Sequence, residues 1–260
     1  FQRAIDALAH LPETPESARL GIDIRLELRH PATLLRQFDK VSEGLREAER
    51  LTRLLSDARR LGWVLSFLAE HYRLVYELGD ALRAAEHAMK VATTVADHDL
   101  RVVANLYLGQ VCWTRGDYQA AARHLRANVE ALQGDLSRRL LGLAGPPSII
   151  SRSWLARSLA ELGEFAEGIT IASDGLRIAE QLTSVFALVH LCTNSGTVHL
   201  LRGDLDAAIP LLERALALAR EHVPLHVTTG AAYLGYAYAR RGRLPEALAL
   251  LTEAVERAPS

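Results

Sequence analysis

Small and apolar residues recur along this chain at helical spacing, and short polar turns interrupt them at regular intervals. The turns share a motif in which a glycine is followed by an acidic or polar residue and then by small residues. The motif stands at Gly79–Ala84, Gly116–Ala121, Gly163–Gly168, Gly203–Ala208 and Gly242–Ala247. Recurrence at roughly this period, about 40 residues, predicts a stack of similar supersecondary units. The abundance of Ala, Leu, Arg and Glu favours helix within each unit.

Small residues also fall at fixed distances from the motif glycine. Seven residues before it stand Gly109, Ala156, Gly196 and Gly235, and five residues after it stand Ala84, Ala121, Gly168, Ala208 and Ala247. Two antiparallel helices joined by a short turn can approach closely only where their facing side chains are small. The spacing therefore predicts one tightly packed pair of antiparallel helices in each unit. Looser packing is expected where Tyr72 and Asn128 replace the small residue.

The last unit resembles the tetratricopeptide repeat. Its residues at that family's signature positions are Leu234, Gly235, Tyr238, Gly242, Ala247, Ala254 and Pro259. The resemblance implies an all-α fold, an α-solenoid of antiparallel helix pairs that forms a right-handed superhelix of about six repeats. Pro259 is expected to stop the final helix, because proline lacks a backbone donor and clashes with the preceding turn.

The same offsets divide the whole chain into repeats. We expect one helical repeat domain over residues 1–260, in which residues 1–12 form the second helix of a truncated repeat. The six further repeats are predicted at about residues 16–56, 62–97, 101–133, 150–182, 188–221 and 227–259, and residues 134–149 are predicted to be an insertion loop. In the first of these repeats, the first helix is expected over Glu16–Arg29, and Pro31 is expected to interrupt the helical pattern beyond it.

The composition and the motifs point away from catalysis. The net charge is −1 and there is no basic run, so neither nucleic acid nor an anionic membrane is an expected partner. No apolar stretch approaches the roughly 18 residues that span a bilayer. No phosphate-binding loop, metal-ligand cluster or nucleophile–base pair can be assembled. We predict a cytoplasmic protein that is not an enzyme and holds no cofactor or metal, with Cys112 and Cys192 as buried, reduced hydrophobic residues.

In the architecture that the resemblance implies, the first helices of successive units line a concave face. Positions ten, nine, six, three and two before the motif glycine point inward there, and they hold many aromatic, arginine and amide side chains. Such side chains form the energetic centres of interfaces and pair with extended peptide backbones. The candidate partner-binding residues are Arg73, Tyr107, Gln110, Trp113, Trp154, Arg157, Asn194 and Tyr236. The alternative is that these side chains only pack neighbouring repeats together.

A stack of helix pairs is a surface for holding a partner, which predicts a non-catalytic regulatory or scaffold module that binds a protein or a peptide. Ala4–Pro12, Ala179–Leu182 and Leu201–Glu221 resemble the C-terminal helical region of large bacterial signalling proteins. In those proteins, an adenylate/guanylate cyclase domain precedes an AAA-type ATPase and tetratricopeptide repeats. This resemblance implies sensing of a partner or self-association. The alternative is a small-ligand sensor, as in ATPase transcription regulators that resemble MalT and have similarly long repeat units.

Overall fold

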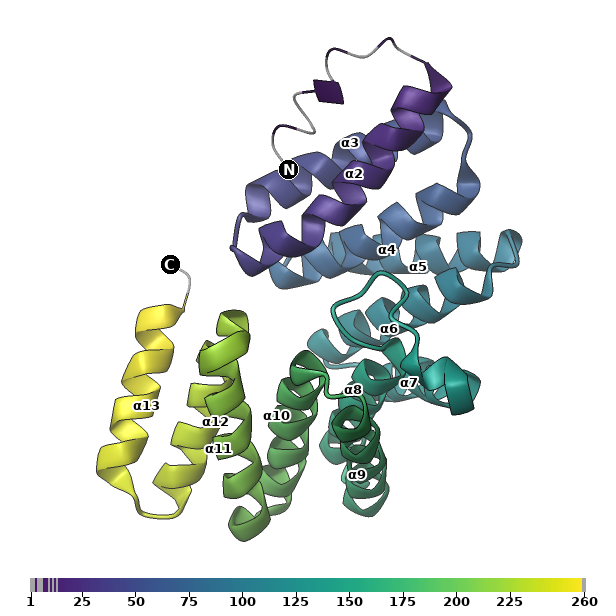
Figure 1. Ribbon diagram of the computed structural model, residues 1–260. Coiled ribbons are helices and arrows are strands. Elements are labelled where there is room, and N and C mark those ends of the chain that lie inside the picture. The colour runs from purple at the N-terminus through teal and green to yellow at the C-terminus, as the bar shows by residue number, and fades with distance from the viewer. Residues whose placement is uncertain (1–2, 4–6, 9, 11, 13, 259–260) are drawn as a thin grey trace. The chain divides into compact units, whose positions relative to one another are not determined.

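In the computed structural model, the described residues are 3, 7–8, 10, 12 and 14–258. Over them the chain forms twelve α-helices, two short 3-10 helices and no strand (Figure 1). The helices are α2 (Pro15–Leu34), α3 (Phe38–Leu54), α4 (Ala58–Leu74), α5 (Leu78–Thr94), α6 (His98–Thr114), α7 (Tyr118–Ala131), η1 (Gly134–Arg138), α8 (Pro147–Glu161), α9 (Phe165–Gln181), α10 (Val185–Arg202), α11 (Leu205–His222), η2 (Pro224–His226), α12 (Val227–Arg240) and α13 (Leu244–Arg257). The prediction of an all-α solenoid fold is confirmed.

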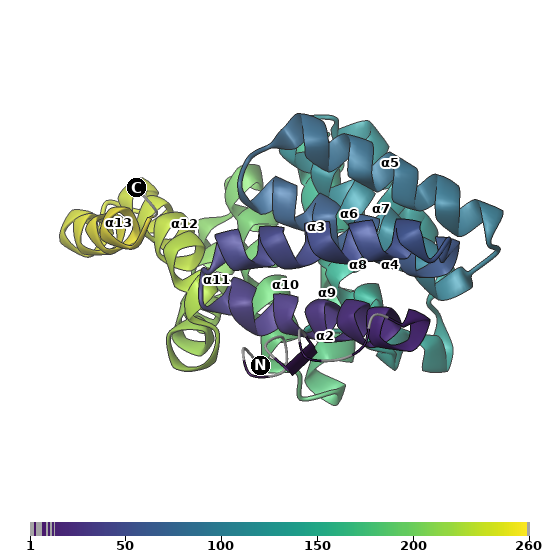
Figure 2. The same ribbon diagram turned by 90° about the horizontal axis from the view of Figure 1, so that it is seen from above.

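The chain divides into two compact units, residues 1–117 and 118–260. In the first unit, α2 packs on α3, α4 packs on α5, and α6 packs on both α4 and α5; Figure 2 shows α2 and α3 side by side. In the second unit, the pairs are α8 with α9, α10 with α11, and α12 with α13. The first helices of consecutive pairs also touch, α8 with α10 and α10 with α12. The expectation of a single domain over residues 1–260 stays a prediction.

The turns in the first unit are evenly spaced along the chain. One residue with positive φ follows each helix, and these residues are Arg36, Ser56, Tyr76, Ala96 and Gly116. At Tyr76 the backbone N–H donates to the carbonyl of Arg73 (3.2 Å), and the N–H of Glu77 donates to that of Tyr72 (2.9 Å). This pair of bonds is the Schellman motif, which satisfies carbonyls that a helix end leaves unpaired. The same short turn thus joins helices within a pair and between pairs.

The turn of the second repeat lies at Tyr76, and its predicted position at Gly79 was wrong. Gly79 is the second residue of α5 and has no positive φ. The turns within the pairs are then almost equally spaced along the chain, at Arg36, Tyr76, Gly116, Gly163, Gly203 and Gly242. Only the step from Gly116 to Gly163, which contains the insertion, is longer. With the turn at Tyr76, the small positions of this repeat hold alanines that are fully buried, Ala69, Ala81 and Ala88. Tyr72 is therefore not a departure from the pattern.

Small residues bring the two helices of a pair close together, as predicted. A β-carbon on Gly196 of α10 would lie 2.7 Å from Cγ of Leu212 on α11, and one on Gly235 of α12 would lie 2.9 Å from Cγ of Leu251 on α13. Atoms do not approach that closely without something shifting, so a larger residue at either glycine would push the helices apart. Asn128 also differs from the expectation of loose packing, because it is buried and donates to Ser151 Oγ of α8 (3.2 Å).

The first described helix continues beyond its internal proline. Pro31 does not interrupt the first helix of its repeat, since α2 continues to Leu34. The hydroxyl of Thr33 donates to the carbonyl of Arg29 (2.8 Å), and the N–H of Leu35 donates to that of Pro31 (3.0 Å), so the last turn keeps its shape despite the donor that proline lacks. The predicted helix over residues 1–12 and the stop at Pro259 fall largely or wholly outside the described residues.

The insertion between α7 and α8 contains a short helix and is bonded to α8. Within residues 134–149, η1 is followed by a turn, and Ser148 Oγ, already in α8, donates to the carbonyl of Ser137 (2.6 Å). Cys112 and Cys192 are both free and buried, as expected, and burial raises the pKa of Cys192 to about 11. In the part of the chain that the structure describes, no helix has the length and apolar character to cross a bilayer.

Alanine at Gly79 and at Gly203 should change stability in opposite directions. Gly79→Ala should raise the free energy of unfolding by about 0.5–1 kcal/mol, because glycine is a poor residue inside a helix and the new β-carbon would meet only Arg83 Nη1 at 3.6 Å. Gly203 has φ 89°, a left-handed conformation that strains a residue with a β-carbon. Gly203→Ala should therefore lower the free energy of unfolding by about 1–2 kcal/mol. Urea denaturation measures both effects. A loss of stability in Gly79→Ala would contradict the turn assignment.

Candidate functional site

The candidate site is built on two positions of the first helices α4, α6, α8, α10 and α12, nine and six residues before the turn residue. Residues three apart lie on one face of a helix, so each first helix contributes a pair of side chains, and we call these pairs the inner rows. In the first unit they are Phe67 and Glu70 on α4, and Tyr107 and Gln110 on α6. In the second unit they are Trp154 and Arg157 on α8, Asn194 and Thr197 on α10, and Tyr233 and Tyr236 on α12.

Aromatic and charged groups meet along the inner rows of the first unit. The ring of Phe67 contacts that of Tyr107 edge to face, with centroids 6.1 Å apart, and the guanidinium carbon of Arg29 lies 3.3 Å from the centroid of Phe67. Burial raises the pKa of Tyr107, and the charge and hydrogen bond of Glu70 raise it further. The Tyr107 hydroxyl therefore stays protonated and acts as a donor toward Glu70.

Two basic groups beside Glu70 are affected by burial as well. Burial lowers the pKa of His30 on α2, Arg29 lowers it further, and Glu70 opposes both. Burial also lowers the pKa of Arg73, and Glu70 is again the first opposing charge. Glu70 is thus the anion around which Arg73, His30 and Tyr107 are arranged in this unit.

Gln110 stands out among these side chains because its carbonyl is unsatisfied. The residue is 5% exposed, and its Oε1 accepts no hydrogen bond from any residue that the structure describes. A buried acceptor without a donor costs about 1–3 kcal/mol. Trp113, one turn further along α6, is half-buried. The inner row of α6 therefore ends in a buried acceptor that no described residue satisfies.

In the second unit, a chain of hydrogen bonds crosses three first helices. Ser153 Oγ of α8 donates to the carbonyl of His190 on α10 (3.1 Å) and accepts from Asn194 Nδ2 (2.7 Å). Arg157 of α8 donates to Asn194 Oδ1 (3.5 Å) and to the hydroxyl of Tyr233 on α12, and its guanidinium lies 4.9 Å from the centroid of that ring. Arg157 thus links side chains of three consecutive repeats.

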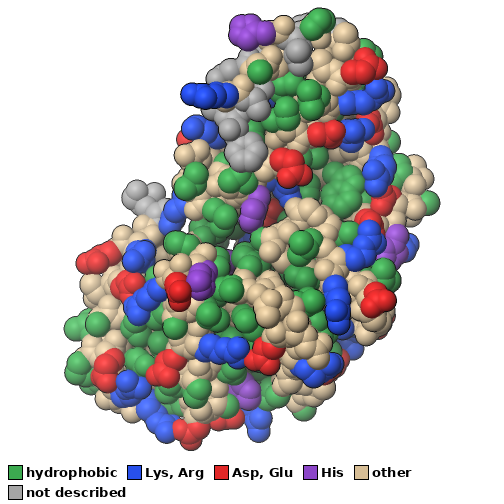
Figure 3. Space-filling view, in the orientation of Figure 1, with side chains coloured by type: hydrophobic (Ala, Val, Ile, Leu, Met, Phe, Trp, Pro, Cys, Tyr) green, Lys and Arg blue, Asp and Glu red, His purple; other side chains and the backbone are tan. Residues whose placement is uncertain are grey.

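The other predicted residues of this unit are more accessible. Tyr236 is 48% exposed, and its hydroxyl accepts from Arg240 Nη1 (3.1 Å) one turn later on α12. Trp154 is half-buried on α8. Side chains of both signs are interspersed over the face seen in Figure 3, in keeping with the net charge of −1. The charges on this face therefore do not add up to one long-range field of a single sign.

The structure brings some of the predicted residues together and leaves others apart. Arg157 contacts Asn194, and Tyr107 lies close enough to Arg73 to affect its pKa, whereas Tyr236 contacts Arg240. The sequence analysis missed Phe67, because the misplaced turn at Gly79 moved its helix by three residues. The pair Leu68–Ala69, eight and seven residues before Tyr76, is the signal that would have found it. That the eight residues bind a partner stays a prediction.

Comparisons with known proteins agree with this fold. Residues 186–260 match one tetratricopeptide-repeat family model, and residues 102–127 and 150–172 match another. These segments therefore match tetratricopeptide repeats, as predicted. No curated protein matches its sequence.

Solved structures with the same fold include three of particular interest. One is the Rap conjugation gene regulator of plasmid pLS20 in complex with the Phr* peptide, at 16% identity and a TM-score of 0.74, covering 98% of this chain and 66% of that one. NprR in complex with its cognate peptide NprX has 14% identity and a TM-score of 0.71, covering 98% and 70%. A thermophilic tetratricopeptide-repeat protein of Thermus thermophilus has 22% identity and a TM-score of 0.56, covering 76% and 92%. At these identities the likeness concerns the fold alone.

Loss of the Arg157 guanidinium should destabilise the second unit more than loss of the Tyr236 ring. Arg157→Gln breaks buried bonds to Asn194 and Tyr233 and should cost about 1–3 kcal/mol of unfolding free energy. Tyr236→Ala changes a half-exposed side chain and should cost about 0.5 kcal/mol or less. Urea unfolding of the two variants gives both values. Equal, small losses would show that Arg157 does not hold the repeats together.

Proposed function

We propose that this chain is a non-catalytic module that binds a protein or peptide partner, with an extended peptide segment lying across the inner rows of one unit. The fold that it shares with Rap and NprR, both solved with bound peptides, supports the proposal. So does the content of the inner rows, where aromatic rings, guanidinium groups and amides alternate within reach of one another. These groups combine large contact area with polar bonds to a peptide backbone.

The observation that carries the proposal is the unsatisfied carbonyl of Gln110. An extended peptide offers a backbone N–H at every residue except proline. One such N–H on Gln110 Oε1 would convert a buried, uncompensated acceptor into a bonded one, so binding would recover a cost that the free protein bears. Tyr107 and Trp113 on the same helix would supply contact area beside that bond.

We assign different roles to the eight candidate residues. Gln110, Tyr107, Trp113 and Arg73 are proposed to contact a peptide on the first unit, and Trp154 and Tyr236 are proposed to contact a partner on the second unit. Arg157 and Asn194 bond each other, and Arg157 also bonds Tyr233, so they are proposed to position the inner rows. Packing between repeats and binding are then two roles of one surface.

The wider setting is also a proposal. We place this module in the cytoplasm, within a bacterial signalling protein whose other domains include a cyclase and an AAA-type ATPase, where peptide binding or self-association would be the regulatory event. A small-ligand sensor of the MalT-like kind remains the second candidate. The specific observation in its favour is the long, nearly constant step between the turns at Arg36, Tyr76 and Gly116. Binding of oligosaccharides and not of peptides would favour the sensor over the peptide-binding module.

The sharpest test uses Gln110→Met, which keeps the length of the side chain but removes the amide. Peptides selected by this protein from a phage library of random decapeptides should bind Gln110→Met at least tenfold more weakly by calorimetry. The free energy of unfolding should stay unchanged or rise, because the unsatisfied acceptor is gone.

Tyr76→Ala is the matched control. Tyr76 is 79% exposed in a turn and outside the inner rows, so its removal should leave affinity within twofold. Wild-type affinity in Gln110→Met would refute the proposed role of this carbonyl. Binding of maltotriose with no selectable peptide would favour the sensor hypothesis instead.

A further inference from the structure

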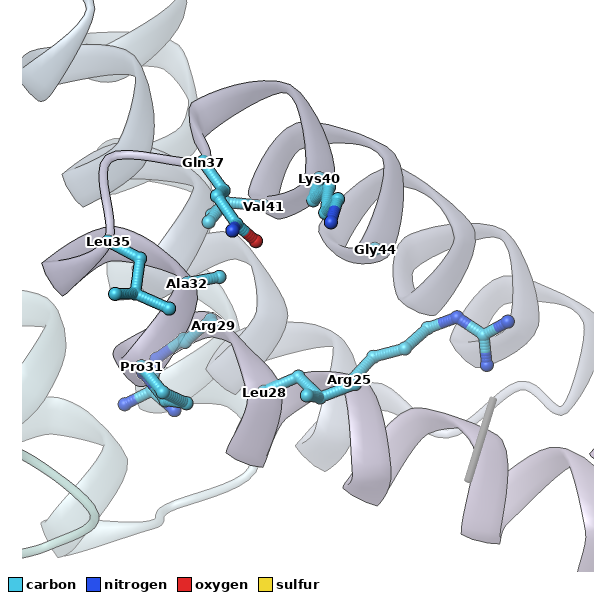
Figure 4. A pocket seen from close by; sticks show the side chains of 10 residues that line it. All are labelled: Arg25, Leu28, Arg29, Pro31, Ala32, Leu35, Gln37, Lys40, Val41 and Gly44. Carbon is cyan, nitrogen blue, oxygen red and sulfur yellow. The ribbon is translucent and has the colours of Figure 1, made fainter. Parts of the chain in front are cut away.

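A pocket lies between the two helices of the first described pair, and it shares no residue with the inner rows. It has a volume of about 170 Å³. Its walls come from the second half of α2 and the first half of α3, and they consist of Arg25, Leu28, Arg29, Pro31, Ala32, Leu35, Gln37, Lys40, Val41 and Gly44. Figure 4 shows Gln37, just before α3, and Lys40 on α3 reaching toward α2, with Arg25 extending along the gap between the helices.

The apolar part of this pocket has the size of one hydrophobic group. Leu28, Ala32 and Val41 line it, and Leu35 at the end of α2 is 69% exposed. A cavity of about 150 Å³ with aliphatic walls is large enough for benzene. Whole drug-sized ligands need roughly 300 Å³ or more. The pocket therefore suits a leucine-sized or phenyl-sized group.

The charged part of the pocket is entirely cationic. Arg25, Arg29 and Lys40 line it, and no carboxylate does. Arg29 lies over the ring of Phe67. Arg25 donates to the carbonyl of Gly21 (2.9 Å), and neither Arg25 nor Lys40 forms an ion pair with a described residue. Two cations beside an apolar pocket are thus left without a directly bonded counter-charge among the described residues.

Two carboxylates on the same helices are bonded to other arginines, and the pKa of Glu47 is lowered by its hydrogen bond to Arg50 and, less, by the charge of Arg25. Asp23 of α2 is bonded by Arg60 of α4 at 3.1 Å, and Glu47 of α3 is bonded by Arg50 at 2.8 Å. Glu43 is exposed and does not line the pocket. Lys40 is exposed and Arg25 is half-buried, so an anion from the solvent can approach either of them.

We infer that this pocket binds a small apolar carboxylate, with the apolar group against Leu28, Ala32 and Val41 and the carboxylate on Arg25 and Lys40. Arginine suits this role because its planar guanidinium donates two parallel hydrogen bonds to a carboxylate. The side chain and terminal carboxylate of a peptide's last residue have this chemistry, and so does a short branched fatty acid. The site is separate from the peptide-binding face proposed above, so either can fail alone.

The ligand class is tested with matched small molecules followed by amide chemical shifts. N-acetyl-L-leucine, as a model of a peptide C-terminus, should shift the backbone amides of residues 25–44 in a saturable way. N-acetyl-L-leucinamide, which lacks the charge, should bind at least tenfold more weakly. 4-Methylpentanoate binding more tightly than N-acetyl-L-leucine would identify a free acid as the source of the carboxylate. Equal binding of the acid and the amide would overturn the inference.

Variants at Gly44 and Lys40 test the position of the site. A β-carbon on Gly44 would meet nothing closer than Arg25 Cγ at 4.0 Å, so Gly44→Leu should fill the pocket and abolish binding of N-acetyl-L-leucine. Gly44→Ala, which improves helix propensity equally well, should keep affinity within twofold. Lys40→Gln should weaken binding at least fivefold.

Lys90→Gln is the control for Lys40→Gln, because Lys90 is the chain's other lysine and is exposed on α5. It should leave affinity unchanged. Full binding by Gly44→Leu, or equal losses in Lys40→Gln and Lys90→Gln, would overturn the inference. Binding seen only after residues 1–13 are removed would mean that the chain's own N-terminal segment is the occupant, and would overturn it as well.

Discussion

The close approach of the two helices within each pair is the constraint on which the rest of this structure depends. The same three positions make the contact in the fifth and sixth repeats. A glycine seven residues before the turn faces a leucine nine residues after it, as Gly196 faces Leu212 and Gly235 faces Leu251. The carbonyl of the alanine five residues after the turn lies 3.2–3.3 Å from the missing β-carbon. Ridges of one helix fit grooves of the other at the short end of the usual spacing only when one side is this small.

That contact also decides which side chains are left for function. Once the face with the small residues is buried against the partner helix, the positions nine and six residues before the turn lie on a different face. There they meet the first helices of neighbouring repeats, as the bonds from Arg157 to Asn194 and Tyr233 show. The inner rows are therefore a consequence of packing inside each pair, and binding chemistry can vary on them without changing the fold.

Much of the fold could be predicted from the sequence because the close packing of each helix pair requires small residues at fixed positions. The helix pairs and the repeat period follow from glycines and alanines at fixed offsets. The turn of the second repeat could not be found in this way, because Tyr76 adopts a positive φ that glycine usually provides. Gly79, three residues later, has the right neighbours for the motif and the wrong conformation. The even spacing of the turns in the first unit, visible only with the backbone, resolves the ambiguity.

The site was less predictable than the fold. Residue types and offsets placed Tyr107, Gln110, Arg157 and Asn194 on one side of their helices, but the partners of Arg157 lie in two other repeats, far away along the chain. No local pattern encodes such distances. The difference between Asn194, whose amide is bonded, and Gln110, whose carbonyl is not, depends equally on neighbours from other helices. Composition indicates which groups can bind a peptide, and only packing shows which of them are still available.

A double-mutant cycle between Gly196 and Leu212 tests the central constraint most directly. Gly196→Ala should lower the free energy of unfolding by about 1–3 kcal/mol, because the added methyl group overlaps Leu212. In a Leu212→Ala background, the same substitution should cost nothing or stabilise the protein through better helix propensity. The account predicts a coupling of at least about 1 kcal/mol between the two sites. Equal costs of Gly196→Ala in both backgrounds would contradict it.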